Sequence, residues 1–306
     1  MANKRSFVRA VLLFFLCAAL VAGCKTTDVI DGLGAVQLGG FRLSESQVGA
    51  LKKTAVALEK AFTDITPEQE YYVGRAVGAT LLGKYSPRTD SQTVEYLNLV
   101  GQSLARVSDM PETYGGYHFV LLEDEGINAF AAPGGLIFIS RGMLRCCKDE
   151  DALAAVLAHE IAHVQLKHGL QAIKTSRLTS AFSIMATEGA KQAGGPQLAQ
   201  LTGIFEDSIH DVTATLVNSG YSRAFEREAD VAALEILRRA GYDQRALVAM
   251  LGEMKQRLNP QGLDFAKTHP DPADRIADLA PQLAGVKTPA GMTVRQQRFQ
   301  RILGSI

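Results

Sequence analysis

The chain has 306 residues, of which 47% are hydrophobic and 21% are charged, so it can build a substantial core and is not a disordered chain. Its 32 basic residues equal its 32 acidic residues, which argues against nucleic acid as a partner. The four cysteines include no Cys-x-x-Cys pair, which argues against a disulfide scaffold and a zinc ribbon.

The first residues have the pattern of a secretory signal. Three cations among residues 1–9 precede an apolar stretch at residues 10–23, which is short for a membrane span. The stretch runs into Val21-Ala22-Gly23-Cys24, which resembles a bacterial lipobox and implies cleavage before Cys24 and lipidation of its thiol. We therefore expect a periplasmic protein anchored by lipid, and Lys25 favours the inner leaflet of the outer membrane. An ordinary signal peptide or an uncleaved anchor is the alternative.

The rest of the chain divides by composition and by helix signals. We expect a signal peptide at 1–23, a lipidated tether at 24–43, an N-terminal helix at 44–65, a main domain at 66–283 and a C-terminal tail at 284–306. Thr66 and Pro67 have the pattern of an N-cap and first turn for a helix that ends near Lys84. A further helix is expected at about 93–107.

The middle of the chain predicts a small sheet followed by helices. Short β-type runs at 117–122, 127–131 and 136–139 are separated by turn residues. Beyond Gly142 the pattern is almost wholly helical. The expected fold class is α+β and mostly helical, with a small antiparallel sheet beside the helices that carry the candidate site.

His159-Glu160-Ile161-Ala162-His163 lies on a strongly helical background. Residues four apart project from one helix face, so His159 and His163 can bind one zinc ion while Glu160 reaches a water held by that metal. The alternative is a pair of hydrogen-bonded histidines near a core.

A catalytic zinc needs a third protein ligand. A second helix is expected to begin at Ser222, and it carries Glu226 and Asp230 one turn apart. If Glu226 is the third ligand, Asp230 on the same face can accept the free N–H of a ligating histidine. We interpret Glu228 as part of a solvated helix face.

Together these motifs resemble the gluzincin zinc metallopeptidases that include the CAAX prenyl endopeptidase, the heat-shock membrane peptidase and the mitochondrial stress-activated peptidase. The resemblance covers about residues 66–283 and favours the periplasmic lipoprotein branch, without a tetratricopeptide tail. It is carried by His159-Glu160-x-x-His163, Ser222-Arg223-x-x-Glu226-x-x-Ala229-Asp230, Asn128-Ala129-Phe130-Ala131-x-Pro133-Gly134-Gly135, His269-Pro270 and Asp274-Arg275-Ile276.

The resemblance implies a zincin-like fold, one zinc ion per chain and peptide-bond hydrolysis with Glu160 as general base. It implies that His269 and Arg275 lie across the cleft, where either could stabilise the oxyanion. His269 has two alternative readings: a reversible fourth ligand that silences the site, or a residue that only closes a turn before Pro270.

The resemblance also implies that Asn128, Ala129, Phe130 and Ala131 form a cleft-edge strand, which can bind extended substrates through main-chain hydrogen bonds. The alternative is an ordinary sheet strand. Substrates are expected to be misfolded or mis-assembled envelope proteins. The competing function is a proteolytically latent chaperone or assembly factor that retains the metallopeptidase fold.

Other features are less specific. Apolar spacing within 170–220 predicts a helical hairpin, either a lid over the cleft or a pair of helices packed on the core. His168 and His210 are interpreted as surface or hydrogen-bonded histidines. Cys146 and Cys147 are interpreted as small buried hydrophobic residues.

Overall fold

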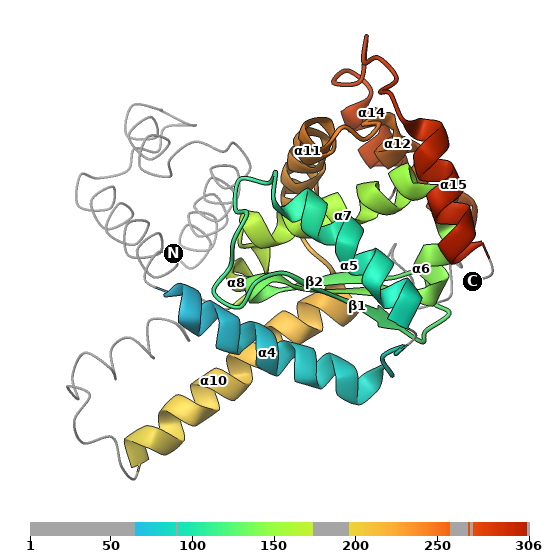
Figure 1. Ribbon diagram of the computed structural model, residues 1–306. Coiled ribbons are helices and arrows are strands. Elements are labelled where there is room, and N and C mark those ends of the chain that lie inside the picture. Colours follow the sequence, from blue (N-terminus) through green and yellow to red (C-terminus); the bar gives the residue numbers. More distant parts are fainter. Residues whose placement is uncertain (1–64, 90, 174–195, 258–268, 270–271, 305–306) are drawn as a thin grey trace, which may run out of the picture. The chain divides into compact units, whose positions relative to one another are not determined.

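The computed structural model describes residues 65–89, 91–173, 196–257, 269 and 272–304 (Figure 1). The chain divides into two units, residues 1–65 and residues 66–306. The expected signal peptide, the tether with Cys24 and the helix at 44–65 fall in the first unit, which lies outside the described residues except for Ile65.

The described residues form helices and one small sheet, in this order: α4 (Pro67–Lys84), α5 (Ser91–Ala105), β1 (His118–Leu122), β2 (Ala129–Ala132), the 3-10 turn η1 (Pro133–Gly135), β3 (Leu136–Ser140), α6 (Arg141–Cys146), α7 (Glu150–Gln165), α8 (His168–Gln171), α10 (Pro196–Ala214), the π-helical turn η2 (Thr215–Ser219), α11 (Arg223–Ala240), α12 (Arg245–Arg257), α14 (Pro272–Leu279) and α15 (Met292–Leu303). The mostly helical α+β, zincin-like class expected from the sequence is confirmed.

The sheet is mixed, which corrects the expected antiparallel arrangement. Its strand order is β1-β3-β2, with β2 antiparallel to β3 and β1 parallel to β3. The hairpin turn between β2 and β3 was visible in the sequence. The short connection after β1 was not a hairpin, because β3 inserts between β1 and β2. The expectation was wrong at this one connection.

Glycines allow α4 to sit directly against the β2–β3 turn. A Cβ atom on Gly74 would lie only 1.8 Å from the carbonyl oxygen of Pro133. Gly134 and Gly135 within the turn adopt φ values of 74° and 94°, which favour glycine. The buried Glu70 of α4 accepts a hydrogen bond from the Gly134 N–H, at 3.2 Å. The end of β2 is therefore held in place by α4.

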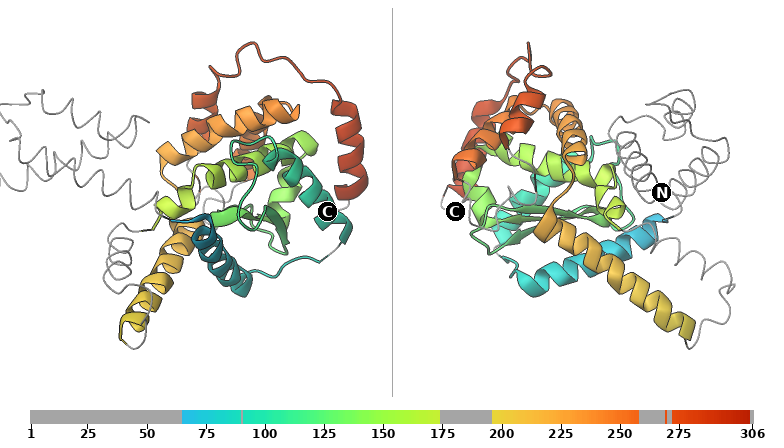
Figure 2. Two further views of the ribbon diagram at one scale, coloured as in Figure 1. Left: turned by 60° about the vertical axis from the view of Figure 1, so that its left-hand side comes forward. Right: turned by 180° about the vertical axis from the view of Figure 1, so that it is seen from behind.

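The helices cover both faces of the sheet. α5 and α7 lie on one face, and α4 lies on the other, beside α10 (Figures 1 and 2). Val212 in α10 and Leu216 in η2 are buried, as expected for helices packed on the core. Leu198 and Leu201 fall where side chains are not described, and the rest of the expected hairpin, residues 174–195, is outside the described residues.

α7 is the central helix, and every residue from Glu150 to Val164 is buried. It packs most extensively against α11, and also against α5, α12 and α15. The segment 284–306, expected to be a tail, contains α15, in which Phe299 and Leu303 are buried. The last helix therefore contributes to the core around α7.

A buried carboxylate joins α15 to the start of α7. The side chain of Glu150 accepts hydrogen bonds from the hydroxyls of Tyr96 (2.7 Å) and Tyr242 (2.9 Å) and from Nε of Arg298 (2.6 Å). Burial alone would raise the pKa of Glu150. The hydrogen bonds from Arg298 and the two tyrosines have the larger combined effect, so the pKa lies below its usual value. The ionised form is therefore the one that the fold stabilises.

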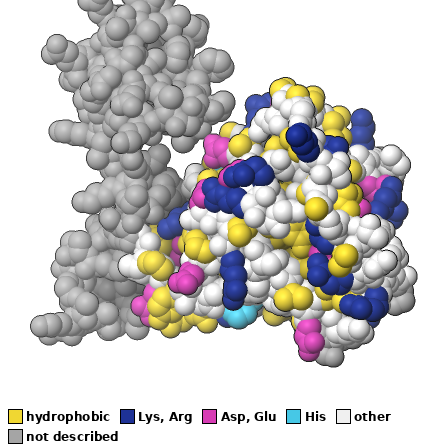
Figure 3. All heavy atoms as spheres, turned by 45° about the horizontal axis from the view of Figure 1, so that its top comes forward, with side chains coloured by type: hydrophobic (Ala, Val, Ile, Leu, Met, Phe, Trp, Pro, Cys, Tyr) yellow, Lys and Arg dark blue, Asp and Glu magenta, His cyan; other side chains and the backbone are white. Residues whose placement is uncertain are grey.

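The surface of the second unit carries mixed charge. On the face shown in Figure 3, Lys and Arg side chains are spread among acidic and hydrophobic ones. Within the described ranges, no helix is both long and apolar enough to cross a membrane.

We predict that Glu150→Gln lowers the free energy of unfolding by roughly 1–3 kcal/mol at pH 7, because a charge-assisted network is replaced by weaker bonds. Since the folded pKa of Glu150 is depressed, its contribution is present above the unfolded pKa and is lost as pH falls through the folded pKa.

Urea unfolding of both proteins between pH 7 and pH 3 tests this prediction. The gap between Glu150→Gln and the parent should narrow as the solution is acidified. Glu95→Gln, on the exposed side of α5, is the control and should leave stability unchanged. A gap that stays constant with pH would contradict the assignment.

Candidate metal centre

α7 places two imidazoles side by side. The Asp149 carboxylate caps the helix by accepting the Ala152 N–H at 2.8 Å. One turn separates His159 from His163, so both rings lie on the same face. Their Nε2 atoms are 3.1 Å apart and their ring centroids 4.7 Å apart. Both side chains are buried.

α11 brings a carboxylate to the same point. It begins at the cap residue Ser222, as expected, and ends at Gly241, whose φ is 77°. Glu226 is buried on the side that packs on α7. Its Oε2 lies 3.4 Å from Nε2 of His159, and its Oε1 lies 3.4 Å from Nε2 of His163. The three residues expected to be metal ligands are therefore together.

His269 completes a group of four donors. Its Nδ1 lies 2.8 Å from Oε1 of Glu226, and its Nε2 lies 4.0 Å from Oε1 of Glu160. One donor atom from each of His159, His163, Glu226 and His269 lies within 4.8 Å of every other. The structure thus places His269 inside the donor group.

Asp230 and Arg275 lie behind the donors. Oδ1 of Asp230 is 3.0 Å from Nδ1 of His159, the geometry expected for a carboxylate that fixes a ligating imidazole. Arg275 donates from Nε to Oδ2 of Asp230 at 2.8 Å, and its Nη1 lies 3.2 Å from Oε2 of Glu226. The guanidinium is buried. This arrangement favours a role in orienting the donors.

The charged groups of the centre shift one another's pKa values. Burial raises the pKa of Glu226, but the charges of His269 and Arg275 and two imidazole hydrogen bonds hold it well below the usual range. Burial also raises the pKa of Asp230, whereas Arg275 and a hydrogen bond with His159 lower it to about 2. Burial and Arg275 lower the pKa of His159, but hydrogen bonds with Asp230 and Glu226 raise it to about 9.

Glu160 is the remaining carboxylate of the centre. It is buried, and neither of its oxygens accepts a hydrogen bond from any described residue. Burial raises its pKa above the usual value, although His269 and His159 act in the opposite direction. A buried acidic side chain without a partner costs free energy unless another group occupies its site.

The residues present fit a divalent metal ion. Two imidazole nitrogens and a carboxylate oxygen are ligands that zinc accepts, and a fourth position is available to His269 or to solvent. Glu160, Glu226 and Asp230 lie close to the imidazoles and to the guanidinium of Arg275. A metal ion would take the place of protons on the imidazoles and give Glu160, whose oxygens accept no hydrogen bond from the described residues, a polar neighbour.

The expected substrate strand lies at one edge of the sheet. Ala129, Phe130 and Ala131 belong to β2, and Asn128 precedes it. Asn128 donates its N–H to Oγ of Ser140 at 3.0 Å and accepts the N–H of Ser140 at 2.9 Å. No described strand pairs with the other edge of β2. The strand itself packs against α7 and η2.

Sequence reasoning missed two neighbours of His163. His168 is fully buried and contacts the His163 ring, and burial lowers its pKa to about 4. The ring of Tyr221 stacks on His163 at 4.3 Å. The sequence signals were a third histidine just past the motif and an aromatic residue just before Ser222. Neither signal is specific without the fold.

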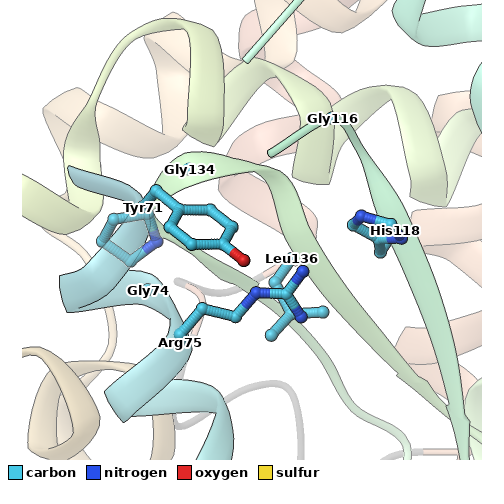
Figure 4. Close-up of a pocket in the computed structure, with 8 residues that line it drawn as sticks. Tyr71, Gly74, Arg75, Gly116, His118, Gly134 and Leu136 are labelled. Atoms are coloured by element: carbon cyan, nitrogen blue, oxygen red, sulfur yellow. The ribbon is translucent and has the colours of Figure 1, made fainter. Parts of the chain in front are cut away.

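A small surface depression between α4 and β1 lies apart from the donors (Figure 4). Figure 4 shows Arg75 and Tyr71 of α4 on one side and His118 of β1 on the other. Arg75 lies over the Tyr71 ring at 4.9 Å, and Nε2 of His118 contacts the carbonyl oxygen of Gly115. None of the four donors lines this pocket.

We predict that Glu226→Gln loses the metal, because the neutral amide is a poorer ligand and leaves Arg275 without part of its counter-charge. Zinc affinity should fall by at least about 100-fold. Metal content by mass spectrometry after desalting at equal protein concentration measures this. Glu206→Gln, an exposed carboxylate of α10, is the control and should keep one equivalent; loss from the control alone would show a misassigned ligand.

Comparisons with known proteins agree with this geometry. The family model described as peptidase family M48 matches residues 91–282. The chain is 29% identical to the mitochondrial metalloendopeptidase OMA1 of Schizosaccharomyces pombe, over 75% of this chain and 65% of that protein. It is 28% identical to the beta-barrel assembly-enhancing protease of Escherichia coli, over 68% of this chain and 42% of that protein.

A third relative matches over nearly its whole length. The metalloprotease LoiP of Escherichia coli is 25% identical, over 92% of this chain and 99% of that protein. The first two relatives are longer, and the matched region spans less than two thirds of each. The family match covers more than half of this chain and includes all four donors, which confirms the resemblance noted in the sequence: the chain belongs to peptidase family M48.

Proposed function

We propose that this protein is a zinc-dependent endopeptidase. The observation that carries the proposal is the convergence of His159, His163 and Glu226 around one point. Beside it lies the buried carboxylate of Glu160, which accepts no hydrogen bond from the described residues. A purely structural zinc site has no need of such a carboxylate. The names of the relatives, all proteases or endopeptidases, support the same activity.

Zinc is the metal that the donor chemistry favours. Imidazole nitrogen and carboxylate oxygen suit zinc at a site with three protein ligands and one open position. We propose one zinc ion per chain, held by His159, His163 and Glu226. When bound, the ion would act as a Lewis acid that makes a water acidic and polarises a peptide carbonyl.

Glu160 would carry the proton during hydrolysis. Its carboxylate accepts a proton from the water as the water oxygen forms a bond to the scissile carbonyl carbon. It then gives that proton to the amide nitrogen as the C–N bond breaks, so that the products are a carboxylic acid and an amine. Burial raises the pKa of Glu160, which supports this role because an efficient acid–base group has a pKa near the working pH.

His269 and Arg275 have different geometries. The position of His269 within the donor group supports a role as a fourth ligand that substrate or water displaces. The alternative is that the displaced His269 stabilises the oxyanion. Arg275 is paired with Asp230 and Glu226, which supports a role in holding the donors. We propose that Asp230 fixes the tautomer of His159.

We propose that substrates bind as an added strand at β2. Its outer edge is unpaired with any described strand, and β2 packs against α7, the helix that carries Glu160. Main-chain hydrogen bonds from those groups of the Asn128–Ala131 segment that do not face β3 would accept many sequences. Misfolded or mis-assembled envelope proteins fit this mode. The name of the beta-barrel assembly-enhancing protease links that relative to the assembly of envelope proteins.

We predict that Glu160→Gln reduces cleavage of unfolded casein by about 10²–10⁴-fold, because it removes the general base. The zinc content should stay at one equivalent, since Glu160 is not a ligand. Fragment yield by gel electrophoresis, with metal content measured on the same samples, tests this. Equal yields from both proteins would contradict the mechanism, and no cleavage by either would favour the latent assembly factor.

We propose further that the protein is a bacterial envelope lipoprotein, anchored through Cys24 to the inner leaflet of the outer membrane. The lipobox-like residues 21–24 support this assignment.

We predict that Cys24→Ser releases the protein from the membrane fraction into the soluble fraction of the envelope, because a serine hydroxyl cannot receive the lipid. Fractionation and immunoblotting test this, with Cys17→Ser as the control that stays in the membrane. Retention of Cys24→Ser in the membrane would instead favour an uncleaved anchor.

A further inference from the structure

His168 lies directly behind the metal-binding face of α7. The helix ends at Gln165, Lys167 adopts a left-handed backbone with φ of 57°, and the chain turns into α8. This turn brings His168 back against His163, with the two Nδ1 atoms 2.9 Å apart. The side chain of His168 is fully buried. The contact between His168 and His163 therefore results from the left-handed turn at Lys167.

The second nitrogen of His168 faces α11. Its Nε2 lies 3.3 Å from Oε2 of Glu228. The ring also stacks on Phe225 at 4.4 Å, with only 6° between the planes. Both partners come from the helix that carries Glu226. His168 is thus in contact with α7 through Nδ1 and with α11 through Nε2 and the ring face, so the orientation of its ring is fixed.

The hydrogen-bond directions follow from the position of His163. Its Nε2 faces Nε2 of His159 and Oε1 of Glu226, at 3.1 Å and 3.4 Å, so Nε2 is the nitrogen available to a metal. The ring proton must then sit on Nδ1 of His163, which donates to Nδ1 of His168. In turn, Nε2–H of His168 donates to Glu228. One tautomer of each ring satisfies every contact.

We propose that His168 and Glu228 are positioning residues that fix the tautomer and orientation of His163 and thereby strengthen metal binding. This inference rests on the proposed metal centre. It assigns to His163 the kind of support that Asp230 provides directly to His159. On this view α11 contributes one ligand, Glu226, and a supporting carboxylate for each of the two imidazoles.

Glu228 distinguishes this role from simple packing. Its side chain is 42% exposed, so replacing its carboxylate by an amide changes little in the core. If His168 were only a packing residue, Glu228→Gln would behave like any other surface substitution. If the relay operates, the neutral amide is a weaker acceptor, and the effect must reach the metal through His168 and His163.

The experiment measures the zinc dissociation constant of the purified protein by competition with a chromophoric chelator. His168→Phe keeps a flat ring against Phe225 but removes both hydrogen bonds, and should weaken zinc binding by about 10–100-fold. Glu228→Gln should weaken it by a smaller factor of about 3–10. Such shifts leave the centre filled with stoichiometric zinc, so they are seen in the dissociation constant rather than in metal content.

The double variant provides the sharpest test. Because Glu228 acts through His168, adding Glu228→Gln to His168→Phe should cause no further loss. Glu206→Gln, an exposed carboxylate of α10, is the surface control and should bind zinc as the parent does. The melting temperature of each chelator-treated variant shows whether the fold is intact.

Wild-type zinc affinity in a folded His168→Phe would overturn the proposal. A Glu228→Gln variant with the same zinc dissociation constant as Glu206→Gln would also overturn the proposal. This comparison still tests the proposal if His168→Phe does not fold. His163→Ala distinguishes an error in the metal centre from an error in the proposed roles of His168 and Glu228. If it binds zinc like the parent, the metal centre itself is misassigned; if it loses zinc while the other variants do not, only the relay is wrong.

Discussion

The packing of α11 against α7 is the contact on which the rest of the structure depends. It brings the carboxylate of Glu226 to within 3.4 Å of two imidazoles that one turn of α7 already aligns. Each of these groups is costly to bury alone. Their burial becomes favourable when a cation and the ion pair between Arg275 and Asp230 share the charge. The sheet, the caps and α15 hold α7 where this contact can form.

The centre has an ordered set of supports around its donors. Asp230 contacts His159 directly, whereas Glu228 reaches His163 only through His168. Glu226, Glu228 and Asp230, the carboxylates involved, lie within little more than one turn of α11. We therefore expect substitutions of Glu228 and Asp230 to lower metal affinity although neither carboxylate is proposed as a ligand. The family match covers this whole region, while the sequence before residue 66 belongs to a separate unit.

Much of the site was predictable because helix geometry relates sequence spacing to direction. His159 and His163 share a face by periodicity, and Ser222 and Gly241 mark the ends of α11 by their capping chemistry. The β1 pairing was not predictable, because a short loop does not reveal that a later strand inserts beside it. His168 was missed for a related reason: its contact with His163 depends on the left-handed turn at Lys167, not on a helical repeat. The positions of His269 and Arg275 rested on resemblance alone.

The most direct test of the account is the coordination of zinc in the loaded protein, observed by crystallography or by X-ray absorption spectroscopy. The account predicts a single ion bound by Nε2 of His159, Nε2 of His163 and a carboxylate oxygen of Glu226, with the fourth position taken by water or by a displaceable His269. An ion bound elsewhere, or a fourth protein ligand that inhibitors and substrates never displace, would contradict it.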